Sequence, residues 1–245
     1  MANRTLVVLA AALFALTVLI RAPASWLLGA IPSSIECQLP GGSMWRGACG
    51  QLRFAGATLN DVRWQLHPWA LLGGHLELAL QCADVRAPAT ATLALGMGGH
   101  LTVRDLRADL QIDSGFLPLF PTDWSGRVQL ALASVELNAG RLASVHGTVT
   151  ARSLAQIRPA MPFGSYELRF ADTPGTDGVV AAELRDLGGP QAVTGTLVVH
   201  NGSEYVLSGL AATRADASPE LAKAVEFLGP ADPQGRRQYS LAGSF

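Results

Sequence analysis

Apolar and polar residues alternate with a period of two along most of this chain. In the segments Leu76 to Leu80 and Tyr166 to Phe170, every second residue is a large apolar one. Such alternation predicts β-strands with one buried face and one exposed face. Turn sequences such as 96–99 and Asn138-Ala139-Gly140 separate the alternating segments. The strands are therefore expected to follow one another as an antiparallel meander.

Interruptions of the alternation predict local features of this meander. Gly56 and Asn60-Asp61 break the pattern early in the chain, which indicates two strands joined by a tight turn. Asp105 shifts the phase of the next alternating run, which predicts a β-bulge, and a similar slip occurs at Ser134. Asn201-Gly202 lies between two strand-like segments and predicts a two-residue hairpin turn.

The period changes near the C-terminus, where a short helix is expected. Ser218 followed by Pro219 is typical of an N-cap and a first helical position, and Gly229-Pro230 ends the helix. The apolar residues between them fall on one helical face: Leu221, Val225 and Leu228. The last segment, 238–245, alternates again and predicts a strand at the edge of the sheet.

We therefore expect an all-β fold: a long, curved, mostly antiparallel sheet that is partly rolled, with one short C-terminal helix. An open sheet is favoured over a closed barrel because a meander with one apolar face can curl around its own side chains. An open sheet leaves edge strands that other chains can extend. The segment 157–164 contains two prolines and is expected to be a linker or a crossing, which leaves a subdivision of the body at that point as an alternative.

The N-terminal stretch Leu6 to Ile20 carries no charged residue, which is typical of a membrane-embedded helix. We expect a single transmembrane anchor over 5–31, with 1–4 in the cytosol because Arg4 precedes the apolar run, and 32–245 in the periplasm. A cleaved signal peptide is the alternative, because Ala22-Pro23-Ala24 resembles a cleavage site. Both interpretations place the body outside the cytosol.

Composition narrows the class of protein further. A positive mean hydropathy and a charged fraction of only 15% exclude a disordered chain. The formal net charge is −1 and the basic residues are scattered, so no nucleic-acid-binding surface is expected.

The sequence offers little catalytic chemistry. The glycines at 96–99 lack the helix and basic residue of a phosphate-binding loop, and no serine lies in a nucleophile elbow. Asp105, Asp109 and Asp113 are expected on the solvated face of strands, and the five histidines at strand ends or turns. We therefore expect a protein that is not an enzyme and has no cofactor or bound metal.

Three cysteines suit an oxidising compartment. Cys37 and Cys49 flank a glycine-rich turn, and a hairpin there would bring them together as a disulfide, leaving Cys82 unpaired. The alternative is three buried thiols that act as small apolar residues.

Several motifs occur in an order that resembles one known family. Gly42-Ser43-Met44-Trp45-Arg46-Gly47 is followed by a strand-turn-strand segment that contains Val62 to Pro68 and Leu71 to Leu76. Near the end come Tyr205 to Gly209, the 218–221 helix start, Leu228-Gly229, Asp232, Gly235 and Tyr239 to Gly243. In order and spacing these motifs resemble the N component of the bacterial type II secretion system, over essentially the whole chain. The cysteines depart from the family pattern.

The resemblance implies an accessory inner-membrane component that supports export of folded exoproteins and has no catalytic activity. Its implied partners are other inner-membrane subunits of the system and the subunit that contacts the outer-membrane channel. Trp45, Trp64 and Trp69 are candidates either for contacts with those partners or for packing within the sheet's own core. A second hypothesis is a periplasmic groove protein that binds lipid along a curled apolar sheet face, and a third is a structural tether without a specific ligand.

Overall fold

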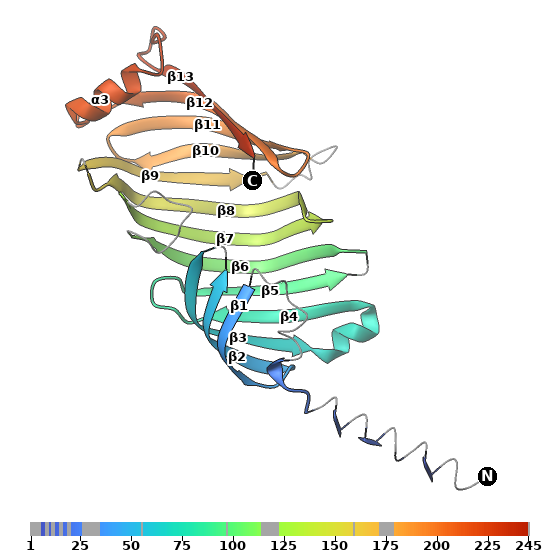
Figure 1. Ribbon diagram of the computed structural model, residues 1–245. Helices are drawn as coiled ribbons and strands as arrows, with labels where there is room; N and C mark the ends of the chain where they lie inside the picture. Colours follow the sequence, from blue (N-terminus) through green and yellow to red (C-terminus); the bar gives the residue numbers. More distant parts are fainter. Residues whose placement is uncertain are drawn as a thin grey trace.

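The computed structural model describes residues 35–54, 56–96, 98–113, 123–158, 160–171 and 179–244, and near the N-terminus residues 6, 7, 10, 13, 14, 17, 18 and 21–25. Within these residues, thirteen strands form one antiparallel sheet in which each strand pairs with the next one in sequence. The sheet is a long curved ribbon whose first three strands turn out of the plane of the others (Figure 1). Because β1 and β13 are unpaired edges, the sheet is open, and the expected all-β antiparallel fold is confirmed.

The strands are longest in the middle of the sheet, where β7 and β8 have 15 and 16 residues. In chain order the elements are β1 (Ile35–Gly42), β2 (Arg46–Phe54), β3 (Ala57–His67), the 3-10 helix η1 (Pro68–Gly73), β4 (His75–Cys82), β5 (Ala89–Gly96), β6 (His100–Ile112), β7 (Trp124–Asn138), β8 (Arg141–Gln156), β9 (Met161–Phe170), β10 (Val180–Gly188), β11 (Gln191–His200), β12 (Glu204–Thr213), α3 (Pro219–Glu226) and β13 (Arg237–Ser244).

Both phase shifts of the sequence correspond to irregularities of the sheet. Asp105 has a φ of +50°, and the β5–β6 register shifts beside it. The β7–β8 register shifts between Leu132 and Ser134. An aspartate tolerates the left-handed conformation better than a branched residue does. Each irregularity re-aims the chain, so that apolar residues before and after it, such as Val103 and Leu106, pair with apolar residues of β7.

Asn60 and Asp61 do not form the turn that the sequence predicts. The chain turns at Gly56, and Asn60 and Asp61 lie within β3, where Asp61 has a φ of +51°. The physical reason is a contact distant in sequence: the backbone N–H and the side-chain amide of Asn60 both donate to the Asp84 carboxylate in the β4–β5 connection. Ala83 N in turn donates to the Asp61 carbonyl.

Two further expectations about connections differ from the structure. The segment 157–164 is not a linker or a crossing, because β8 ends at Gln156, β9 begins at Met161 and the two strands pair directly. Pro162 lies beside a register shift in that pair, a position where the sheet tolerates proline. The β11–β12 loop spans Asn201–Ser203, one residue longer than the two-residue turn expected, since His200 pairs with Glu204.

The C-terminal helix forms as predicted. Ser218 is its N-cap, and the Ser218 hydroxyl accepts a hydrogen bond of 3.2 Å from the Leu221 N–H. Leu221 and Val225 are buried against the apolar face of the sheet, whereas Leu228, beyond the end of the helix, is 43% exposed. This short helix thus covers one end of the sheet.

Buried side chains form two clusters on the same face of the sheet. The first belongs to β2, β3 and β4 and contains Cys49, Val62, Trp64, Cys82 and, from the N-terminal segment, Ala24. The second lies between β7 and β11 and contains Leu132, Val145, Val180 and Val199. The core is therefore spread along the sheet rather than gathered at one centre.

The expected anchor lies mostly outside the described residues. Those that are described between Leu6 and Val18 are helical, and the Thr17 hydroxyl donates to the Leu13 carbonyl over 2.8 Å. Among the residues that the structure describes, no helix has both the length and the apolar character needed to cross a bilayer.

Candidate functional site

The glycine and tryptophan motif of the first hairpin forms a packing unit with β3. Trp64 is only 8% exposed, and the Trp64 indole N–H donates to the Met44 carbonyl over 3.2 Å. The Trp64 ring lies against Gly47 of the neighbouring strand, where a Cβ would stand 2.2 Å from the ring. Gly47 is therefore required for close packing of Trp64, and Trp45, in the turn itself, is half-buried.

The same turn holds the end of the N-terminal segment. Met44 N donates to the Ala22 carbonyl over 2.9 Å, and Pro23 forms an isolated bridge with Ser43. Ala22 and Ala24 are 1% and 3% exposed, so their small side chains fit into the packed corner, whereas Pro23 between them is exposed. The sequence suggested a cleavage site here, and the structure uses these residues as a contact of the folded domain.

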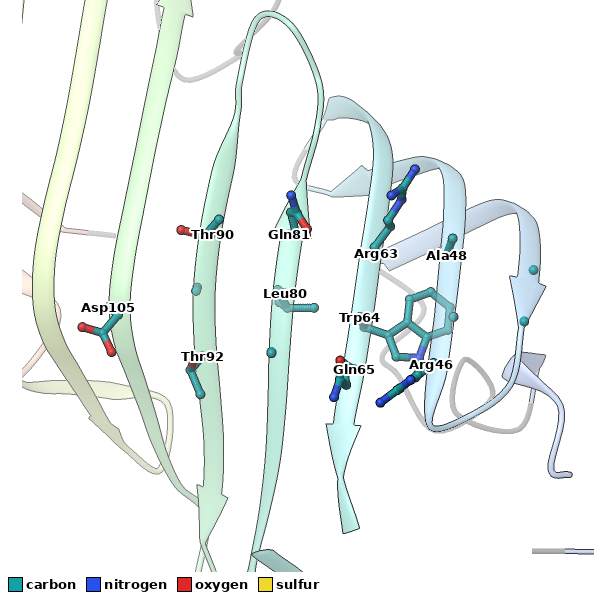
Figure 2. A pocket seen from close by; sticks show the side chains of 15 residues that line it. Arg46, Ala48, Arg63, Trp64, Gln65, Leu80, Gln81, Thr90, Thr92 and Asp105 are labelled. Atoms are coloured by element: carbon teal, nitrogen blue, oxygen red, sulfur yellow. The ribbon is translucent and has the colours of Figure 1, made fainter. Parts of the chain in front are cut away.

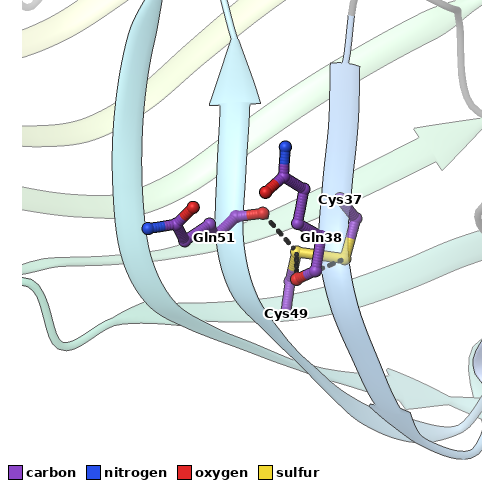
Figure 3. The surroundings of a disulfide bond; sticks show 4 residues. All are labelled: Cys37, Gln38, Cys49 and Gln51. Carbon is purple, nitrogen blue, oxygen red and sulfur yellow. Dashed lines mark hydrogen bonds between the residues drawn. A yellow bond between two sulfur atoms is a disulfide. The ribbon is translucent and has the colours of Figure 1, made fainter.

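The cysteine pair crosses the same hairpin. Cys37 of β1 and Cys49 of β2 are joined as a disulfide with their Cα atoms 5.8 Å apart (Figure 3). They are not directly opposite, because Cys49 pairs with Pro40 in the register. The Sγ atom of Cys49 lies 3.0 Å from the Gln51 carbonyl oxygen, a contact rather than a hydrogen bond because a disulfide sulfur carries no proton. Formation of this bond in the cell remains a prediction.

Cys82, at the end of β4, and Asp84, in the β4–β5 connection, are both buried. Burial raises the pKa of the Cys82 thiol, which favours the unreactive neutral form. Burial alone would also oppose ionisation of Asp84, but hydrogen bonds from the Arg86 N–H and from the backbone and side chain of Asn60 lower the pKa of Asp84. Asp84 thus stabilises the β4–β5 connection as a carboxylate.

A hollow of about 770 Å³, lined by both polar and apolar residues, lies over β1 to β6 (Figure 2). Figure 2 shows the Trp64 ring turned toward β2, while Gln81, Thr90 and Thr92 project from β4 and β5. Arg63 and Asp105 are also part of its lining. Among the described residues, no group of three or more acidic, histidine or cysteine side chains is arranged to hold a metal ion.

A second cavity, of about 620 Å³, lies between α3 and the apolar face of the sheet; we call it the α3 groove. The rim on one side is formed by Ala224, Val225 and Leu228, and the opposite side includes Trp124 and Phe163, whose rings stack with centroids 4.8 Å apart. The floor consists of residues from β8 to β13: Ala151, Leu154, Tyr166, Leu184, Gln191, Val193, Leu207, Ala211, Tyr239, Ser240 and Leu241. The lining is thus predominantly apolar.

The tyrosines of the α3 groove have internal partners. The Tyr166 hydroxyl lies 2.6 Å from the Phe163 carbonyl and 3.1 Å from Gln191 Oε1, and the Tyr239 hydroxyl donates to the Thr194 carbonyl. Burial, with a smaller contribution from the Asp186 carboxylate, raises the pKa of Tyr166 to about 12. Burial likewise raises the pKa of Tyr239. Both hydroxyls therefore stay protonated and serve the internal structure of the groove.

Trp69 differs from the other two candidate tryptophans. It lies in η1, between β3 and β4, and is 80% exposed. The structure therefore brings Cys37, Cys49, Trp45 and Trp64 together in one corner and leaves Trp69 outside the core. Sequence reasoning missed the exposed neighbour Leu72 and the α3 groove, although the apolar face of the C-terminal helix was a signal for the groove.

The fold and these surfaces define a class: an open β-sheet scaffold whose prominent exposed features are apolar surfaces suited to binding. The model of the family described as type II secretion system (T2SS), protein N matches residues 33–240, and the chain belongs to this family. It is therefore a component of the type II secretion system, as the sequence motifs indicated.

Two relatives that share one name are similar to the chain. The type II secretion system protein N of Aeromonas hydrophila is 25% identical over 243 residues, which cover 94% of this chain and 95% of the relative. The Vibrio cholerae protein of that name is 38% identical over 72 residues, 29% of this chain and 27% of the relative. No solved structure matches the chain.

Proposed function

We propose that this chain is a single-pass inner-membrane subunit of the type II secretion system, with its sheet in the periplasm, where it supports export of folded exoproteins through protein contacts. The match to the family over residues 33–240 carries this proposal. The uncharged run Leu6 to Ile20, preceded by Arg4, supports the membrane placement and the cytosolic N-terminus. The partners are other inner-membrane subunits and the subunit that contacts the outer-membrane channel.

The two edge strands are the surfaces best suited to such contacts. β1 and β13 each have a backbone edge that a strand of a partner can extend. Apolar side chains on these edges are well exposed, with Leu39 at 80% and Leu241 at 60%. Backbone pairing supplies affinity in such a contact, and the apolar side chains supply specificity.

In-cell photocrosslinking tests this function. A photoreactive residue replaces Leu39 or Leu241 in the full chain, and the control replaces Val85, which is 94% exposed but lies in the β4–β5 connection. We expect crosslinks to inner-membrane secretion subunits from the edge positions and none from position 85. Crosslinks that are equally frequent at all three positions, or that contain no secretion subunit, would contradict the proposal.

Membrane placement is tested separately by labelling. A cysteine in place of Ala2 is expected to stay unlabelled by an impermeant maleimide in spheroplasts, whereas one in place of Asp216 is labelled. Retention of an N-terminal tag on the mature chain distinguishes the anchor from a cleaved signal peptide. Labelling at position 2 in intact spheroplasts would reverse the proposed topology.

The α3 groove favours a second candidate function, the binding of one lipid acyl chain. Its volume of about 620 Å³ is within the usual range for small-ligand sites, and its lining suits an apolar chain. Because both groove tyrosines have internal partners, binding a hydrocarbon leaves neither hydroxyl without a hydrogen bond.

Native mass spectrometry of the full chain, extracted in detergent, tests this second function with two matched variants. Ala224→Trp places a large ring at the rim of the α3 groove, whereas Lys223→Trp adds the same ring on the same helix at a position that does not line the groove. We expect lipid on the wild type and on Lys223→Trp, and a loss of it on Ala224→Trp. Absence of lipid from the wild type, or equal lipid on both variants, would exclude the groove.

A further inference from the structure

The 3-10 helix η1 exposes a set of large apolar side chains. Trp69 is 80% exposed, Leu72 is 83% exposed and Leu71 is 48% exposed, and η1 has no buried residue at all. We call Trp69, Leu71 and Leu72 the η1 patch. Single exposed apolar residues are ordinary on protein surfaces, but three within four consecutive positions form a patch of the kind that marks a binding surface.

Backbone contacts place the η1 patch beside the point where the N-terminal stretch meets the sheet. The Ala22 carbonyl accepts from Met44 N, and the Trp45 carbonyl accepts from Leu66 N over 2.7 Å. Leu66 and His67 are the last residues of β3, and η1 begins immediately after them. In Figure 1, η1 lies at the ends of β3 and β4, on the side of the sheet from which the N-terminal stretch departs.

Side chains around the η1 patch suit the boundary between lipid and water. Tryptophan is enriched at that boundary because its ring is apolar and its indole N–H can reach polar headgroups. Arg21 and Arg46 on the adjoining segments are exposed cations that can approach lipid phosphates. The nearby carboxylate of Glu77 lies 3.1 Å from His67 Nδ1 and 4.0 Å from His75 Nε2.

We propose that the η1 patch is a second membrane contact, in which Trp69 and Leu72 enter the interfacial layer of the bilayer that holds the N-terminal stretch. This inference rests on the proposed membrane placement of that stretch. One helical anchor leaves a domain free to tilt and rotate over the surface. A second contact beside it fixes the ends of β3 and β4 at the bilayer and so sets the orientation in which the sheet meets its partners.

Fluorescence in vesicles tests the contact on the full chain. In a Cys82→Ala background, Leu72→Cys carries an environment-sensitive nitrobenzoxadiazole label, and the chain is reconstituted in phosphatidylethanolamine–phosphatidylglycerol vesicles. Val85→Cys is the matched control, since Val85 is 94% exposed, against 83% for Leu72, but lies beyond the opposite end of β4, in the β4–β5 connection. The lipids carry a shallow doxyl quencher. We expect a blue shift at position 72 and a loss of about half of its emission or more, and neither at position 85.

Trp69→Ser sharpens the test because Trp69 is exposed and contributes little to the core. In this variant we expect the quenching at position 72 to fall while carbonate extraction still leaves the chain in the membrane. If the label at position 72 shows the same emission and quenching as the label at position 85, while the chain resists carbonate extraction, the η1 contact is overturned and the proposed anchor stands. Release of the wild type by carbonate would overturn both.

A protein partner is the competing occupant of the η1 patch. In that case the label at position 72 stays in water in protein-free vesicles, and a photoreactive residue in place of Trp69 captures a secretion subunit in cells. That pair of results would overturn the membrane contact. Crosslinks from position 69 to lipid in cells, together with quenching in vesicles, would support it.

Discussion

The two ends of the sheet cover the same apolar face in different ways. At the N-terminal end, the corner of β1 to β4 is filled by its own side chains, with Trp64 packed on Gly47 and Ala24 inserted from the N-terminal segment. At the C-terminal end, the short helix α3 lies over the face and leaves the α3 groove beside it. Close packing leaves no space between Trp64 and Gly47, and the hollow at this end lies open over β1 to β6. At the C-terminal end, the helix spans only part of the face and leaves a predominantly apolar groove.

This difference separates structural residues from binding residues. In the corner, Trp64 packs on Gly47 and Ala24 joins the buried cluster, so these contacts are internal ones. The groove places Leu207 and Leu241 on an open floor, with Leu241 60% exposed. We therefore expect substitutions in the corner to change stability, and substitutions that line the groove to change binding.

The largest expected effect is on Trp64. Trp64→Ala removes a buried ring and its bond to Met44, so the free energy of unfolding should fall by about 3–5 kcal/mol. Urea unfolding followed by circular dichroism measures the loss without relying on tryptophan emission. Trp69→Ala is the control, and its change should stay within about 0.5 kcal/mol because the side chain is exposed. An equal loss in the free energy of unfolding for the two variants would contradict the assignment of Trp64 to the core and Trp69 to the surface.

A somewhat smaller effect is expected at the other end of the sheet. Leu221, in α3, is fully buried, and Leu221→Ala should lower the free energy of unfolding by about 2–4 kcal/mol. Because α3 packs only on the C-terminal end, the loss should appear as faster amide exchange in 219–226 and in β12, with β2 to β4 unchanged. Hydrogen exchange read by mass spectrometry gives this map. Faster exchange along the whole sheet would mean that the two ends unfold as one unit.

Next in size is the disulfide of the corner. Replacing both Cys37 and Cys49 by serine removes a closure over a sequence separation of 12, which should lower the free energy of unfolding by about 2–3 kcal/mol. A reductant should destabilise the wild type by the same amount and leave the double variant unchanged. Peptide mapping without reductant that finds both thiols free in periplasmic protein would reject the pairing.

Asp84 gives the smallest effect and a dependence on pH. Asp84→Asn weakens three hydrogen bonds and should lower the free energy of unfolding by about 2 kcal/mol near neutral pH. Since the pKa of Asp84 is lower in the folded chain than in the unfolded one, acid favours the unfolded state. The stabilisation is complete above about pH 4 and is lost as the pH falls through the folded-state pKa. Urea unfolding should show that wild type and variant differ less in their free energy of unfolding at about pH 3 than at about pH 7. A difference that stays constant with pH would exclude this role of the Asp84 carboxylate.

Much of the fold follows from local sequence signals. Alternation and turn residues predict the meander, because successive side chains of a strand point to opposite faces of the sheet. The phase shift at Asp105 predicts a bulge, because an extra residue is needed there to keep the apolar side chains on one face. Ser218 and Pro219 predict the start of α3, because a helix start needs an acceptor for its free N–H groups. Each of these signals acts within a few residues, so the sequence shows them directly.

Only the tertiary structure decided what depends on partners distant along the chain. Asn60 and Asp61 look like a turn, but their bonds with residues 83 and 84 place them inside a strand. Trp64 and Trp69 are similar as sequence features, yet one packs on Gly47 and the other lies exposed in η1. The α3 groove exists because α3 comes to rest over β12 and neighbouring strands. Local propensity determines the elements, whereas contacts between elements determine which apolar side chains are buried and which remain available for binding.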